Sequence, residues 1–134
     1  MTFNWQDYLD ISKYLTMDDK LIPSEEAKFR TAVSRAYYAS FNSCREFAEK
    51  HLNFTTSKGE NSHEKLIDFL LTTKSNKLIN EIGYKLKLIK KDRIVSDYSG
   101  VFKNYSSQTI TNIFLADEIQ EILEKVSLLT RKKI

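Results

Sequence analysis

The chain has 134 residues, a formal net charge of +3, and only three glycines and one proline. Turn-rich β architectures need many more of these two residues at their corners, so the composition excludes sandwiches, barrels and collagen-like repeats. A hydrophobic fraction of 41% argues against disorder. We therefore expect an all-α fold, an up-and-down bundle of four to five helices that forms a single domain over residues 1–134.

The composition also limits the chemistry and the cellular location. Two histidines and one cysteine exclude a zinc finger and an internal disulfide, and the sequence has no glycine-rich phosphate loop. We therefore expect no metal and no cofactor. No apolar run approaches the ~18 residues that span a membrane, and the first residues do not resemble a signal peptide. The lone cysteine fits a reducing cytoplasm, and the mild positive charge permits nucleic-acid binding.

The first half of the chain predicts two helices. Apolar residues recur at helical spacing over residues 4–16, and Asn4 is placed to cap that helix. Residues 17–23 form a connection in which Pro23 disfavours helical geometry. Ser24 then caps a long second helix that runs to about residue 52. Its predicted apolar stripe consists of Ala32, Val33, Ala36, Tyr37, Phe41, Cys44, Phe47 and Ala48.

The second half predicts three more helices. After a polar loop at 53–61, Ser62 is the expected cap of a helix over residues 63–73. Ser75 or Asn76 caps a fourth helix that runs to about residue 99, and Gly83 within it marks a kink or a close packing point. We expect Gly100 to be left-handed and, after a connection at 101–107, a last helix that ends near residue 130. The predicted inner positions of these two helices are Leu78, Ile79, Ile82, Leu86, Ile89 and Arg93, then Ile110, Ile113, Phe114, Ile119, Ile122, Leu123, Val126 and Leu129.

A polar seam is predicted on the second helix. Arg35, Tyr38 and Asn42 are separated by three and four residues, so they share one face. The face either binds a ligand or holds a buried arginine that is satisfied by carbonyl groups or a carboxylate.

Several segments form a recognisable series of motifs. In chain order they are Trp5-x-x-Tyr8-Leu9, Glu26-Ala27, Arg30-x-Ala32-Val33-Ser34-Arg35-Ala36-Tyr37-Tyr38-Ala39-x-Phe41, Gly59-x-x-Ser62-His63-x-x-Leu66, Leu86-x-x-Ile89-x-x-x-Arg93-x-x-x-Asp97-Tyr98, and residues 116–129. This series resembles the HEPN domain superfamily, and in particular its small stand-alone bacterial and archaeal proteins with an Arg-Ala-Tyr-Tyr-Ala signature. The resemblance implies a bundle of four or five helices that commonly forms a dimer. It implies either a metal-independent ribonuclease of toxin or antiviral systems or a non-catalytic partner of a small nucleotidyltransferase.

The nucleases of this family carry an arginine followed four to six residues later by a histidine. In such a pair the histidine transfers the proton of the 2′-hydroxyl group and the arginine stabilises the phosphate. Here Tyr98 stands five residues after Arg93, and Asn42 stands seven residues after Arg35. With an ordinary pKa near ~10, a tyrosine is a poor general base at pH 7. Asp97 can pair with Arg93, so this segment is either a functional cleft or an internal salt bridge on which Tyr98 packs.

Two further features carry candidate residues. His63 follows Ser62 at the start of a helix, where a positive charge is disfavoured, so we expect it to be neutral, either as a proton acceptor or as a cap-region side chain. A basic run between Tyr84 and Tyr98 is either an RNA-binding face or a solvated helix face. Its members are Lys85, Lys87, Lys90, Lys91 and Arg93.

The sequence therefore yields one leading hypothesis and two alternatives. The leading hypothesis is a HEPN-like homodimer of a toxin–antitoxin or phage-defence system that binds RNA and, in one version, cleaves it without a metal. The first alternative is a non-catalytic module that binds a nucleotide or a partner, such as a minimal nucleotidyltransferase or an antitoxin, and the second is a structural dimer. The candidate catalytic residues are Arg35, Arg93, Tyr98 and His63, and the candidate RNA- or nucleotide-binding residues are Tyr38, Asn42, Lys87, Lys90, Lys91 and Asp97.

Overall fold

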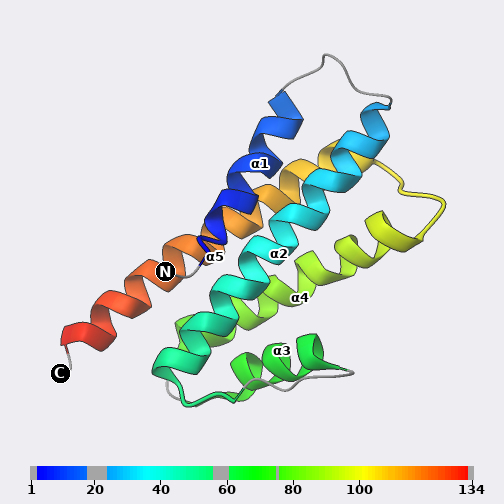
Figure 1. Ribbon diagram of the computed structural model, residues 1–134. Helices are drawn as coiled ribbons and strands as arrows, with labels where there is room; N and C mark the ends of the chain where they lie inside the picture. Colours follow the sequence, from blue (N-terminus) through cyan, green and yellow to red (C-terminus); the bar gives the residue numbers. More distant parts are fainter. Residues whose placement is uncertain (1–2, 18–23, 56–60, 75, 133–134) are drawn as a thin grey trace.

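The computed structural model describes residues 3–17, 24–55, 61–74 and 76–132, and over these residues it contains five helices and no strand (Figure 1). The predicted all-α bundle is confirmed. The helices are α1 (Gln6–Met17), α2 (Glu25–His51), α3 (Ser62–Thr72), α4 (Lys77–Tyr98) and α5 (Tyr105–Lys132). The predictions for Pro23, Gly59 and Ser75 lie outside the described residues.

Three of the predicted helix caps are present. The side-chain oxygens of Asn4, Ser24 and Asn76 accept hydrogen bonds from the amides of Gln6 (3.1 Å), Ala27 (3.1 Å) and Leu78 (2.7 Å). Such bonds satisfy amides that have no partner inside their own helix, which is why these residues mark helix starts.

Two predictions about helix ends are wrong. Ser62 is the first helical residue of α3, and the cap position belongs to Asn61, whose φ of 67° lies in the left-handed region that asparagine tolerates. At the other end of α4, the chain leaves the helix through Ser99 in an extended conformation, and Gly100 is not left-handed. The left-handed residue of this connection is Asn104, directly before α5.

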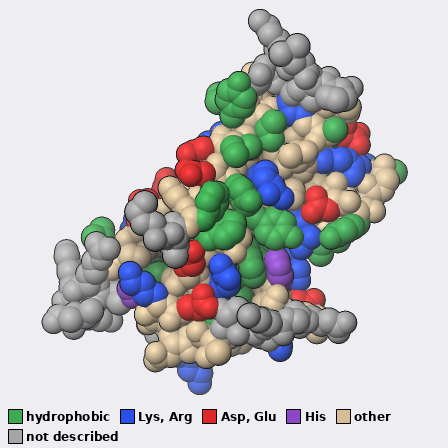
Figure 2. All heavy atoms as spheres, viewed as in Figure 1, with side chains coloured by type: hydrophobic (Ala, Val, Ile, Leu, Met, Phe, Trp, Pro, Cys, Tyr) green, Lys and Arg blue, Asp and Glu red, His purple; other side chains and the backbone are tan. Residues whose placement is uncertain are grey.

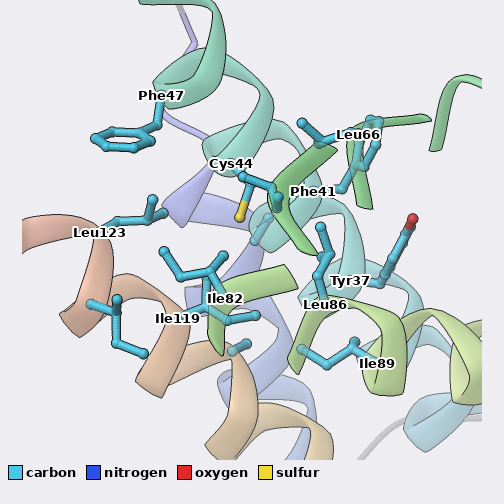
Figure 3. Packing of buried hydrophobic residues seen from close by; sticks show 14 of the residues in the cluster. Tyr37, Phe41, Cys44, Phe47, Leu66, Ile82, Leu86, Ile89, Ile119 and Leu123 are labelled. Carbon is cyan, nitrogen blue, oxygen red and sulfur yellow. The ribbon is translucent and has the colours of Figure 1, made fainter. Parts of the chain in front are cut away.

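The long helix α2 runs through the middle of the molecule and packs against α1, α4 and α5 (Figure 1). The shorter α3 packs mainly on α4, at the lower end of the bundle in this view. The core between these helices is aliphatic and aromatic, and Figure 3 shows Tyr37 at its edge with the hydroxyl group directed away from the neighbouring aliphatic side chains. Completely buried core side chains include Val33, Ala36, Tyr37, Cys44, Ile82, Leu86 and Ile89.

The inner face of α5 differs from the prediction at two positions near its start and one near its end. Ile113, Ile119, Ile122, Leu123 and Val126 are buried as predicted. Ile110, Phe114 and Leu129 are 54%, 63% and 47% exposed, so their predicted burial is wrong. Successive residues are turned by about 100° around a helix, and the core positions in the first half of α5 are occupied by smaller side chains. These side chains are Thr109, Asn112 and Ala116.

Gly83 is a close packing point between α4 and α3. A Cβ atom at this position would lie 3.0 Å from both the Leu70 Cβ and the Leu71 backbone nitrogen. One turn earlier, the Asn80 amide group donates hydrogen bonds to three carbonyls at the end of α3, those of Leu70, Leu71 and Thr73, at 2.8, 3.1 and 2.8 Å. Together these contacts hold the C-terminal end of α3 on α4.

Candidate functional site

The centre of the candidate site is Arg93, on the inner side of α4. The residue is 8% exposed. Its guanidinium carbon lies 5.0 Å from the ring centroid of Tyr37, 5.4 Å from that of Tyr38 and 5.9 Å from that of Tyr98. These distances are within the range of cation–π attraction, so the α2 tyrosines provide much of the environment of this buried charge.

The ionic partner of Arg93 is Asp97, one turn further along α4. The Nη1 atom lies 3.6 Å from the Asp97 Oδ2 atom, which is beyond ordinary hydrogen-bond distance. Within the described part of the chain, the Arg93 Nε atom is buried and has no hydrogen-bond partner. The predicted internal pair is therefore present, but it leaves the donors of a buried arginine incompletely satisfied. The packing of Tyr98 on this pair is loose, because Tyr98 is 77% exposed.

The structure brings His63 from the start of α3 to this arginine. Its Nδ1 atom lies 2.6 Å from the Tyr37 hydroxyl oxygen, and its ring stacks on Phe41 with a centroid distance of 3.9 Å. Burial lowers the pKa of His63 from its ordinary value of 6.5 to about 4, with further contributions from the positive charges of Arg93 and Lys90. The prediction of a neutral His63 at pH 7 is consistent with this shift.

The hydrogen bonds also favour one tautomer of His63. Burial raises the pKa of Tyr37, opposed by the charge of Arg93 and a hydrogen bond with its guanidinium group, so the phenol keeps its proton. A guanidinium group only donates hydrogen bonds. The Tyr37 hydroxyl group, which keeps its proton, is therefore the favoured donor of the hydrogen bond that it shares with the Nδ1 atom of His63. This order leaves the proton of the neutral imidazole on Nε2, where it is a donor.

These side chains line an open hollow of about 390 Å³ between the start of α3 and the inner side of α4. Lys90 contributes a second positive charge, and its Nζ atom lies 3.6 Å from the Glu64 Oε1 atom. The residues that line the hollow are Asn61, Ser62, His63, Glu64, Lys90 and Arg93.

The residues of the predicted seam on α2 do not act together: Arg35 and Tyr38 contact each other, whereas Asn42 bonds within its own helix. Arg35 is half-buried, with its guanidinium carbon 4.7 Å from the Tyr8 ring centroid and 5.5 Å from that of Tyr38. Tyr38 thus contacts both Arg35 and Arg93. Asn42 is buried, and its amide donates to the Tyr38 carbonyl at 2.9 Å, which is a bond within the helix.

The basic run on α4 does not form one face. Lys85 pairs with Glu81 and Glu118 at 3.6 and 3.3 Å, whereas Lys90 and Arg93 face the hollow. Lys87 and Lys91 are exposed on the outer side of the helix. Figure 2 shows basic and acidic side chains interspersed on the face that it displays.

A larger hollow of about 740 Å³ lies between the start of α1 and the C-terminal parts of α2 and α5. None of the predicted site residues lines it. Polar groups in it are paired with one another, since the Trp5 indole donates to Glu46 at 2.9 Å and the Gln6 amide donates to Ser43 at 3.0 Å. Among the residues that the structure describes, no three histidine, cysteine, aspartate or glutamate side chains form a group that could hold a metal ion. In the same part of the chain, no helix is both long and apolar enough to cross a bilayer.

Sequence reasoning missed two residues that shape the site. The sequence predicts Tyr37 as a member of the apolar stripe and of the family motif but not as a site residue, although the need of a buried phenol for a hydrogen-bond partner is a signal for it. Arg30 entered only as part of a motif. Its guanidinium group fixes the end of α4 by donating to the carbonyls of Ser96 (2.9 Å) and Ser99 (2.7 Å), and the sequence carries no local signal of this contact.

Comparison with known proteins adds little about function. No family model and no solved structure matches the chain. The chain is 30% identical over 107 residues to an uncharacterized protein of Methanocaldococcus jannaschii. The match covers 72% of this chain and 63% of that relative, so this chain spans less than two thirds of the protein it resembles.

Proposed function

We propose that the chain is a HEPN-like protein that binds a phosphate group of RNA or of a nucleotide in the hollow beside Arg93. One observation carries this proposal: a nine-tenths buried arginine, whose Nε atom has no hydrogen-bond partner among the described residues and whose ion pair is long, lines a hollow together with Lys90 and His63. Burying a charge without full hydrogen bonding is costly. A phosphate in the hollow would supply strong acceptors to the cations that line it.

The convergence of two separate motifs supports the HEPN-like assignment. The tyrosines of the Arg-Ala-Tyr-Tyr-Ala segment on α2 contact the arginine of the Arg-x-x-x-Asp-Tyr segment on α4. The sequence-based hypothesis places residues of both segments in one functional cleft. Their contact in this chain is what such a cleft requires.

The geometry favours binding without cleavage. A general base works best when its pKa lies near the pH of the reaction. The pKa of His63 is lowered to about 4, and its favoured tautomer presents a donor at Nε2. Tyr98 is exposed and does not line the hollow. Arg35 and Tyr38 extend the site along α2 and offer a cation and an aromatic ring to a base or a further phosphate.

Metal-independent RNA cleavage is the second candidate. The histidine that is missing from the position after Arg93 in the sequence is supplied in space by His63 of α3, which lines the same hollow. A bound phosphate would offset the charges of Arg93 and Lys90 and raise the pKa of His63 towards a useful range.

The partners implied by the resemblance are part of the proposal. They are a second copy of the chain, a minimal nucleotidyltransferase or an antitoxin in a cytoplasmic toxin–antitoxin or phage-defence system. Exposed apolar side chains on the outer side of α4 support a protein contact there. These are Tyr84, Leu88, Ile94 and Tyr98. Light scattering of the purified chain tests the homodimer, since a monomer mass at micromolar concentration would contradict it.

The binding proposal is tested with a fluorescent RNA oligonucleotide and fluorescence polarisation in the absence of metal. We expect Arg93→Met to lower the affinity by about tenfold or more, because a charge-assisted contact is lost. Lys77→Gln, at the exposed start of α4, is the matched control and should change affinity by less than about twofold. The wild-type affinity should fall with rising salt. Equal affinity of wild type and Arg93→Met would refute the site.

The same samples, incubated with RNA and a chelator and run on a denaturing gel, separate the two candidates. Intact RNA supports binding alone. Cleavage that His63→Gln removes would establish the second candidate instead.

A further inference from the structure

We propose that the ligand of this hollow is a phosphomonoester, that is, the terminal phosphate of an RNA end or of a nucleotide, seated on the N-terminus of α3 between Arg93 and Lys90. This inference rests on the proposed function and deepens it, because it specifies which kind of phosphate the site selects.

The first support is the start of α3, an 11-residue helix. Asn61 occupies its cap position and, among the described residues, makes no side-chain cap hydrogen bond. The first intrahelical backbone bond runs from the Lys65 amide to the Asn61 carbonyl, at 2.9 Å. The amides of Ser62, His63 and Glu64 precede that bond, and these residues line the hollow. Amides at a helix start, together with the helix dipole, favour an anion.

The second support comes from a different helix and is independent of the first. Arg93 of α4 lines the same hollow, is nine-tenths buried and, over the described residues, has an Nε atom without a hydrogen-bond partner. A fixed, buried cation therefore faces the same space as the start of α3. The His63 Nε2–H group, favoured by the hydrogen bond from Tyr37, adds a neutral donor.

The charges select the class of phosphate. Each cation of the hollow holds one carboxylate at 3.6 Å, Asp97 in the case of Arg93 and Glu64 in the case of Lys90. Both separations exceed hydrogen-bond distance, and the Glu64 side chain is 62% exposed, so these pairs exchange readily. A ligand that replaces both carboxylates without leaving a cation unpaired must carry about two negative charges. A phosphomonoester carries roughly −1.5 to −2 at pH 7 and has three strong acceptor oxygens. An internal phosphodiester carries only one charge.

The test compares three versions of one RNA oligonucleotide, with a 5′-phosphate, with a 3′-phosphate, or with hydroxyl groups at both ends, by fluorescence polarisation. A second pair, adenosine monophosphate and adenosine, reports on free nucleotides by calorimetry. We expect a terminal phosphate, on RNA or on the nucleotide, to tighten binding about tenfold or more, and inorganic phosphate to compete. The member of the set that binds most tightly identifies the source of the phosphate.

Two variants tie the preference to the hollow. Lys90→Gln should reduce the preference for a terminal phosphate severalfold. Because Lys90 lies at the edge of the core, this variant still tests the inference if Arg93→Met does not fold. Asp97→Asn should tighten binding of the phosphorylated probes, because it removes a competing carboxylate. If all three RNAs bind equally well and binding depends on Arg93, the inference is overturned and the proposed function stands. If no probe binds, both fail.

Discussion

Two arginines on facing helices, the partly buried Arg30 of α2 and the buried Arg93 of α4, are held in opposite ways. The Arg30 side chain is 19% exposed, and its Nε atom donates to Glu26 at 2.9 Å. The Arg93 side chain is only 10% exposed, yet its carboxylate partner is 3.6 Å away. The more buried arginine thus has the poorer set of partners. The further acceptors of Arg30 are the carbonyls of Ser99 (2.7 Å), Ser96 (2.9 Å) and Val95 (3.5 Å).

The contrast teaches which of the two cations serves the fold. Carbonyl oxygens at a helix end have no partner inside the helix, so Arg30 satisfies groups that folding leaves open. Arg93 satisfies few such groups, and aromatic rings surround it instead. By this comparison Arg30 is a structural residue, and Arg93 is the arginine that we propose binds a ligand.

The largest expected effect is on stability and belongs to Arg30. Arg30→Ala removes several charge-assisted hydrogen bonds, so we expect the free energy of unfolding to fall by about 2–3 kcal/mol. Arg93→Met replaces an incompletely paired charge by an apolar chain of similar length, and we expect a change below about 1 kcal/mol. Urea denaturation followed by circular dichroism measures both. The comparison fails if Arg93→Met costs as much as Arg30→Ala.

The next effect is a pH dependence that comes from His63. Its pKa is about 4 in the folded chain and 6.5 ordinarily, so the unfolded chain binds more protons between these values. Stability therefore falls as the pH drops from about 6.5 towards 4. Because the ring is only partly buried, we expect a loss of about 1–2 kcal/mol.

His63→Gln is the control for this pH effect. The carboxylates titrate in both proteins, so only the difference between the two urea-stability profiles reports on His63. The variant should lose about 1–2 kcal/mol less than wild type between pH 7 and pH 4.5. Parallel profiles would show that burial and the charges of Arg93 and Lys90 do not lower the pKa of this histidine.

A smaller effect tests the hydrogen bond between Tyr37 and His63. Tyr37→Phe should lower the free energy of unfolding by about 1 kcal/mol. It should also raise the pKa of His63, since the neutral imidazole loses a donor at Nδ1. Titration of the two histidine ring signals by NMR measures this, with His51 as the internal reference. An unchanged His63 pKa would contradict the proposed tautomer.

The smallest effects are expected on the outer side of α4. Lys87→Gln and Lys91→Gln should each change the free energy of unfolding by less than about 0.5 kcal/mol. They should also weaken RNA binding less than Lys90→Gln does. If fluorescence polarisation shows a larger effect of the outer lysines on binding, RNA binds outside the hollow.

Features that depend on neighbouring residues of one helix were predictable from the sequence, whereas contacts between helices were not. The caps at Ser24 and Asn76 follow from side chains that bond amides two or three residues away. The spacing of Ile110 and Phe114 fits a helix but does not say which side meets the core, so their exposure was missed. The meeting of His63 with Arg93 depends on how α3 lies on α4, which no periodicity within either helix encodes.

Helix α3 is held differently at its two ends. Gly83 and Asn80 hold its C-terminal end against α4, whereas His63 rests on Tyr37 and Phe41 at the other end. Eleven residues at ~1.5 Å each make an arm of about 16 Å. A tilt of about 4° about the C-terminal end would therefore displace the His63 end by about 1 Å. A methyl group at Gly83 would press on the opposite end of α3 from His63, so we expect it to change the distance between His63 and Arg93.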